Sequence, residues 1–129
     1  MKILVADDER CIADYIAGAL NERGYRALPV YSGYDAVEHA RMLRFDAALL
    51  GFVMPGMLGT EVALQIKTLS PETKIVIMTE KVPPEVAASL RRQGFHFGYL
   101  PAPFSWNDLA GLLRPDSFIE DSTCTARRS

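Results

Sequence analysis

The sequence of 129 residues lacks a strong charge of either sign, a disulfide framework and a long apolar run. Its formal net charge is −2, so no overall field favours nucleic acid or an anionic lipid surface as a partner. Cys11 and Cys124 lie far apart in the sequence, which favours free thiols in a reducing cytoplasm. No apolar run approaches the roughly 20 residues of a membrane span, and the first residues lack the pattern of a signal peptide. We therefore expect a cytoplasmic protein that binds neither nucleic acid nor membrane.

Short apolar runs typical of buried strands alternate along the chain with segments of helical spacing. Hydrophobic residues make up 49% of the sequence, and its length suits one domain with a substantial core. The expected strands are the runs 3–6, 25–31, 45–52, 75–79 and 95–99. Five strands alternating with five helices predict an α/β protein with a parallel sheet covered on both faces. Pro29 cannot donate to a neighbouring strand, so the second strand is predicted to lie at the sheet edge.

Helical spacing also predicts which side chains face the core, and polar residues mark where helices begin. The predicted buried faces of the first and third helices are Ile12, Tyr15, Ile16, Ala19 and Leu20, and Val62, Ile66 and Leu69. Ser32 with Asp35, and Ser105 with Asp108, have the spacing of capping boxes at helix starts. Residues 115–129 are polar without periodicity, and we expect them to form a loose tail or the start of a linker.

The run of residues 47–59 joins a buried strand to a Pro/Gly turn, the place where α/β proteins put their chemistry. Its sequence from Gly51 to Gly59 resembles the strand and loop of response-regulator receiver domains, whose pattern is Asp-x-x-Met-Pro-Gly-Met-x-Gly. Gly51 stands where that family has its phosphoacceptor aspartate. The resemblance covers residues 1–114. It implies the CheY-like, flavodoxin-like (βα)5 three-layer sandwich with strand order 2-1-3-4-5.

Four further positions match residues with roles in that family. Asp7 and Asp8 match its acidic metal-binding pair, and one of them could also cap the first helix. Thr79 matches the switch hydroxyl and Tyr99 the switch aromatic, although a strand-ending threonine and a packing tyrosine are both common. Two carboxylates without a third make a poor cage, so we expect no required cofactor and magnesium at most weakly bound.

A second family residue is missing at the end of the fifth strand. Receivers have Lys-Pro-Phe there, and this chain has Ala102, Pro103 and Phe104. The resemblance implies a cis peptide bond between Ala102 and Pro103. The acceptor carried the negative charge of the site and the lysine the balancing positive charge, so losing both leaves the charge sum unchanged. Glu80, where receivers have a small residue, would repel an incoming phosphoryl donor.

These features predict a stand-alone pseudo-receiver of two-component, phosphorelay signalling that works by protein–protein contact and is not an enzyme. The resemblance implies a histidine kinase or output protein as partner, bound at the face of the fourth helix, fifth strand and fifth helix. We expect a monomer or weak homodimer. One alternative is a response regulator phosphorylated at a relocated acceptor, Asp7 or Asp8. Another is a flavodoxin-like cofactor binder or enzyme, although acids after the first strand would repel a phosphate.

Overall fold

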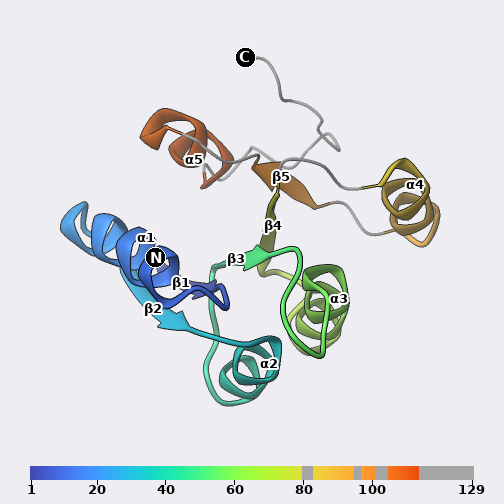
Figure 1. The fold of residues 1–129 in the computed structure, drawn as a ribbon, viewed down its shortest axis with the longest axis horizontal. Coiled ribbons are helices and arrows are strands. Elements are labelled where there is room, and N and C mark those ends of the chain that lie inside the picture. The colour runs from blue at the N-terminus through green and yellow to red at the C-terminus, as the bar shows by residue number, and fades with distance from the viewer. Residues whose placement is uncertain (80–82, 95–96, 101–104, 114–129) are drawn as a thin grey trace.

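The computed structural model describes residues 1–79, 83–94, 97–100 and 105–113. Within them, strands and helices alternate along the chain (Figure 1). The strands are β1 Lys2–Ala6, β2 Arg26–Val30, β3 Ala47–Gly51, β4 Lys74–Met78 and β5 Gly98–Leu100. The helices are α1 Arg10–Glu22, α2 Gly33–Met42, α3 Gly59–Leu69, α4 Pro84–Arg92 and α5 Trp106–Leu113.

The strands form one parallel sheet in the order β2-β1-β3-β4-β5, which confirms the predicted flavodoxin-like topology. Successive side chains of a strand point to opposite faces of the sheet. In β1, for example, Ile3 and Val5 belong to one buried cluster and Leu4 and Ala6 to the other. Helices α1 and α5 cover the first cluster, and α2, α3 and α4 cover the second (Figure 1). The molecule is therefore the predicted three-layer sandwich.

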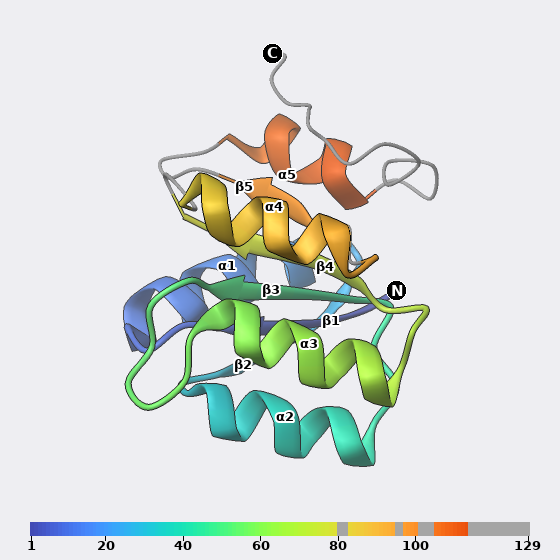
Figure 2. The same ribbon diagram turned by 90° about the vertical axis from the view of Figure 1, so that its right-hand side faces the viewer.

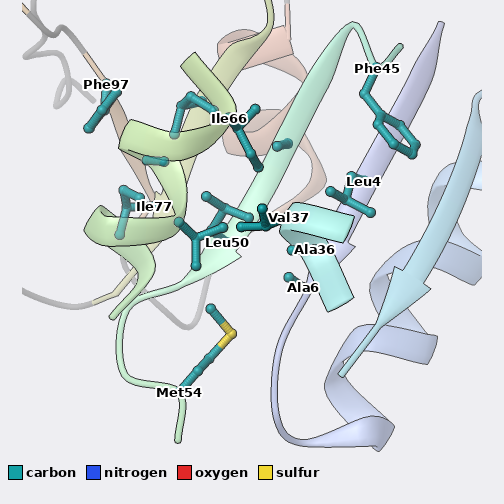
Figure 3. Packing of buried hydrophobic residues seen from close by; sticks show 14 of the residues in the cluster. Leu4, Ala6, Ala36, Val37, Phe45, Leu50, Met54, Ile66, Ile77 and Phe97 are labelled. Carbon is teal, nitrogen blue, oxygen red and sulfur yellow. The ribbon is translucent and has the colours of Figure 1, made fainter. Parts of the chain in front are cut away.

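The larger cluster fills the space between the sheet and helices α2, α3 and α4. Leu4, Leu50 and Ile66 are at most 1% exposed there, and burying such a side chain stabilises the fold by about 1.5–3 kcal/mol. Phe45 and Met54 lie at opposite ends of this cluster (Figure 3). Met54 belongs to the loop after β3, so the loop that follows Gly51 is anchored in the core.

Strand β2 is an edge strand, as its proline predicts. The side-chain amide of Asn21 donates to Ala27 O at 3.2 Å, and its oxygen accepts from Ala27 N–H at 2.8 Å. The backbone N–H and C=O of Ala27 therefore point away from β1. Because these groups alternate in direction along a strand, the same holds for residue 29, where proline has no N–H to leave unpaired. The outer edge of β2 is thus closed to the addition of another strand.

The predicted helix faces are wrong at Ile12 and Tyr15 of α1 and at Leu69 of α3, whereas Ile16, Leu20, Val62 and Ile66 are buried as predicted. Ile12 and Tyr15 are 40% and 77% exposed, and Ala13 and Ala17 are buried instead. Leu69, at the end of α3, is 42% exposed. Ala13 and Ala17 face the sheet because small side chains let the helix approach it closely. Helical spacing predicts a buried face mainly from large apolar side chains, and so it favoured Ile12 and Tyr15.

Both predicted capping sites begin a helix. Ser32 Oγ accepts the N–H of Asp35 at 3.0 Å at the start of α2. At the start of α5 the exchange is reciprocal, because Asp108 N–H donates to Ser105 Oγ and Ser105 N–H donates to the Asp108 carboxylate, both at 3.2 Å. Such a cap stabilises a helix by about 1 kcal/mol. Among the described residues, the helices are all too short or too polar to cross a bilayer.

Candidate functional site

The residues singled out in the sequence meet at the carboxyl edge of the sheet. Ala6 pairs with Leu50, so the next residues, Asp7 and Gly51, lie side by side. Gly51 in turn pairs with Met78, the last residue of β4, and Thr79 follows directly. The carboxyl ends of parallel strands are where such folds place a functional site. Sequence position alone therefore brings Asp7, Gly51 and Thr79 together.

Asp7 is half-buried in this edge, whereas Asp8 is exposed. Asp7 Oδ1 accepts the N–H of Glu9 at 2.9 Å. Glu9 is the N-cap residue of α1, and its side chain makes no capping hydrogen bond. Asp7 therefore fixes the loop that enters the helix and is not itself the cap. Burial raises the pKa of Asp7 above its ordinary value of 3.8, the Glu9 hydrogen bond opposes this, and the charges of Asp8 and Glu9 add to the rise.

Replacing Asp7 by asparagine is expected to stabilise the fold at neutral pH. Because the pKa of Asp7 is raised on folding, the folded state binds the proton more tightly, and stability falls as pH rises from 3.8 through the raised pKa. Asparagine carries no charge, so it removes the cost of burying a carboxylate, and its side-chain oxygen can still accept the Glu9 N–H. The gain should stay below about 1 kcal/mol, because water screens a half-buried carboxylate. Urea denaturation at a series of pH values measures it.

The matched control is Glu38→Gln, which removes an exposed carboxylate from the middle of α2. This variant should follow the wild-type pH dependence. The Asp7→Asn gain should vanish below pH 3.8, where the carboxyl is protonated in both states. A gain that persists unchanged at acid pH would contradict the proposed burial penalty.

Gly51 is buried at the end of β3, with Asp7 beside it. A Cβ at this position would lie 3.2 Å from Asp7 Oδ2, 3.5 Å from Asp7 Cγ and 3.6 Å from Ala6 O. These contacts are tight but not prohibitive, because the nearest atom belongs to a side chain that can rotate. The space beside Gly51 is thus partly taken by the Asp7 carboxylate, and a longer side chain needs Asp7 to move slightly.

The acids at this edge do not make a dedicated magnesium cage. Magnesium demands near-octahedral oxygen ligands. Asp7 has one carboxylate oxygen engaged with Glu9, Asp8 is exposed, and a glycine holds the adjacent position on β3. In the part of the chain that the structure describes, no three His, Cys, Asp or Glu residues are grouped to hold a metal ion. The donor set therefore fits a resident metal poorly.

The loop between β3 and α3 is held by contacts that the sequence analysis missed. Tyr34 of α2 donates its hydroxyl proton to Gly56 O at 3.1 Å, and Gly56 has φ +82°. Gly59 N–H donates to Phe52 O at 2.6 Å, which closes the loop at its base. Glu61 accepts the N–H of Leu58 at 2.9 Å. Figure 2 shows this loop projecting beyond the carboxyl end of β3. No sequence signal names Tyr34, because its partner is a backbone carbonyl.

Of the two positions matched to the family's switch, Thr79 directly follows β4, and Tyr99 lies on the neighbouring strand β5. Thr79 is half-buried, and its N–H donates to Leu100 O at 3.1 Å. Tyr99 pairs with Ile77 and is half-buried against the cluster under α2, α3 and α4. Glu80, Ala102, Pro103 and residues 115–129 lie outside the described residues, so their predicted roles and the predicted cis peptide stay predictions.

Trp106 is a packed residue rather than a free anchor for a partner. Its ring lies 6.1 Å from the Tyr25 ring, and the Arg23 guanidinium stacks 4.1 Å above it. On the far side of β5, Arg91 and Arg92 are exposed in the last turn of α4. Helices α4 and α5 flank β5 (Figure 1), and α4 contributes an exposed basic turn to this face.

Comparison with known families and proteins agrees with this geometry. The response regulator receiver domain family matches residues 3–114. The response regulator MprA of Mycobacterium avium (strain 104) is 30% identical over 117 residues, covering 88% of this chain and 50% of that protein. A response regulator receiver protein of Anaeromyxobacter sp. (strain Fw109-5) is 27% identical over a match that covers 98% of this chain and 58% of that protein. The chain thus spans about half the length of the curated relatives it matches.

Solved structures of similar proteins have the same fold. The chemotaxis protein CheY4 of Vibrio cholerae superposes with a TM-score of 0.77 at 28% identity, covering 87% of this chain and 94% of that one. The response regulator protein TrrA of Thermotoga maritima, solved in complex with Mg(2+)-BeF, gives a TM-score of 0.71 at 28% identity, covering 84% and 92%. The likeness therefore extends over almost the whole described fold.

Proposed function

This chain belongs to the response regulator receiver domain family of two-component signalling, and we propose that it acts there by protein–protein contact without an aspartyl phosphate. The observation that carries the proposal is Gly51, which occupies the end of β3 beside Asp7. A glycine has no carboxylate to accept a phosphoryl group. Signalling that does not use this acceptor must pass through the surface that the fold presents.

The charges around the site support the same reading. A lysine kept without the acceptor would leave an ammonium unpaired near the carboxyl edge, which is costly. The sequence has Ala102 where receivers have that lysine, so anion and cation are lost together. Asp7 makes no ion pair with the described residues, and burial raises its pKa. A site with this charge balance is suited to contact rather than to phosphoryl transfer.

We propose the face of α4, β5 and α5 as the contact surface, with a histidine kinase or an output protein as partner. Tyr99 lies on β5 at the centre of this face and is half-buried. The exposed Arg91 and Arg92 give its α4 side a positive charge. A partner with acidic side chains opposite α4 would associate faster because of that charge.

The mass of the intact protein after incubation with acetyl phosphate and magnesium should remain unchanged. The expected result follows from the missing carboxylate at residue 51. A receiver that retains its aspartate, treated in parallel, shows that the donor is active. A stable gain of one phosphoryl group would overturn the proposal, and peptide mapping would then tell whether Asp7 or Asp8 had become a relocated acceptor.

A further inference from the structure

A shallow groove opens at the amino edge of the sheet, opposite the candidate site. Its volume is about 270 Å³, below the ~300 Å³ at which small-molecule sites usually begin, so it suits one or two side chains better than a cofactor. Leu28, Leu43 and Phe45 supply its apolar surface. Phe45 is almost fully buried at this end of the core (Figure 3), whereas Leu43 is 44% exposed.

Two cations border this groove. Lys2 begins β1 and Arg26 begins β2, and both line the groove. Neither side chain makes an ion pair with any residue in the described ranges. The backbone of β2 is not open to an added strand, because Asn21 holds both polar groups of Ala27. An occupant must therefore bind through apolar and acidic side chains, not by strand pairing.

We propose that the groove binds the chain's own residues 116–121, Asp-Ser-Phe-Ile-Glu-Asp. This segment lies outside the described residues. It combines two adjacent large apolar residues, Phe118 and Ile119, with three carboxylates that complement Lys2 and Arg26. Elsewhere in residues 114–129, the charged side chains are arginines, which the cationic border would repel.

The segment can reach the groove from the end of α5. Helix α5 follows β5 and returns toward the amino edge of the sheet, where it ends near the level at which β1 begins (Figure 2). Even from β5, the edge strand β2 is four strand spacings away, roughly 19 Å at ~4.8 Å each. The five residues from 114 to 118 extend to about 17 Å at ~3.3 Å each. The two lengths are comparable. Because α5 covers the face of the Ile3 cluster, and Leu28 and Phe45 belong to the other cluster, the segment must also pass round the amino edge to reach the groove.

Such binding would cover the exposed Leu43 and neutralise Lys2 and Arg26. It would leave the carboxyl edge, with Asp7 and Gly51, untouched at the opposite end of the sheet. This binding does not depend on whether the site is phosphorylated, so the two proposals fail separately.

Amide NMR spectra of the full-length chain test the proposal. Replacing Phe118 and Ile119 together by serine should shift the resonances of Leu28, Leu43 and Phe45. The matched control, Thr123→Ser with Thr125→Ser, changes the same stretch outside the binding segment and should leave them in place. Replacing Lys2 and Arg26 by glutamate should release the segment, and adding Glu120→Lys with Asp121→Lys should restore the wild-type contacts. Circular dichroism confirms that each variant is folded.

Groove resonances that do not respond to the Phe118/Ile119 change would overturn the proposal. Failure of the charge exchange to restore the contacts would also overturn it. Shifts that grow with protein concentration would assign the groove to the segment of a second copy, and so reject binding within one chain. Shifts independent of concentration, together with restoration by the exchanged charges, are the expected result.

Discussion

Replacing Gly51 by aspartate and Ala102 by lysine in the same chain is expected to produce magnesium-dependent phosphorylation, whereas we expect none for the wild-type chain. The new carboxylate would stand beside Asp7, since the Cβ fits once Asp7 Oδ2, 3.2 Å away, rotates aside. Together with Asp8 it would supply the third oxygen ligand that magnesium lacks here. The lysine would balance the charge of the acyl phosphate, as the family resemblance implies. Intact-mass measurement after incubation with acetyl phosphate reads the outcome.

Two controls separate chemistry from folding in that experiment. Gly51→Asn with Ala102→Lys has the same shape but cannot form an acyl phosphate, so its mass should not change. Gly51→Asp alone places three carboxylates together, and their repulsion should make it less stable than Gly51→Asn until magnesium is added. If the double variant folds, binds magnesium and stays unphosphorylated, the missing pair is not what blocks the reaction, and Glu80 becomes the next position to change.

The parts of the fold that the sequence predicted are those governed by strong local rules. Alternating apolar runs located all five strands, and the missing N–H of Pro29 placed β2 at the edge of the sheet. The faces of α1 were harder to assign, because alanines rather than the larger Ile12 and Tyr15 face the sheet. How closely a helix approaches a sheet is a tertiary property that hydrophobic spacing does not encode.

The candidate site was predicted where it depends on chain position and missed where it depends on backbone contacts. Strand ends brought Asp7, Gly51 and Thr79 to one edge, as the motif positions required. The hydrogen bond from Tyr34 to Gly56 O joins residues of different elements through a carbonyl, which every residue type has. The residue type therefore cannot identify such an acceptor. Only the folded chain shows that Tyr34 holds the loop through Gly56 O.

Gly59→Ala is expected to be the most destabilising single change at this site, by about 2–4 kcal/mol. A Cβ on residue 59 would lie 2.1 Å from Gly51 O, 3.0 Å from Gly51 C and 3.1 Å from Phe52 Cα. All three are backbone atoms, so the clash cannot be relieved by a side-chain rotation. The loop would have to open and lose the bond from Gly59 N–H to Phe52 O. Thermal unfolding should show a midpoint lower by roughly 10 °C.

Gly18→Ala is the matched control, because a Cβ there meets no atom within 4 Å in helix α1. It should stabilise the helix by up to about 1 kcal/mol, since alanine has the higher helix propensity. Equal midpoints for the two variants would contradict the close backbone approach at Gly59. The close packing at Gly59 also explains why the loop keeps the receiver pattern although Gly51, at the first position of that pattern, does not match it. Gly59 is required by packing against Gly51 O, whatever residue 51 does chemically, so the motif can persist as a folding requirement after its acceptor is gone.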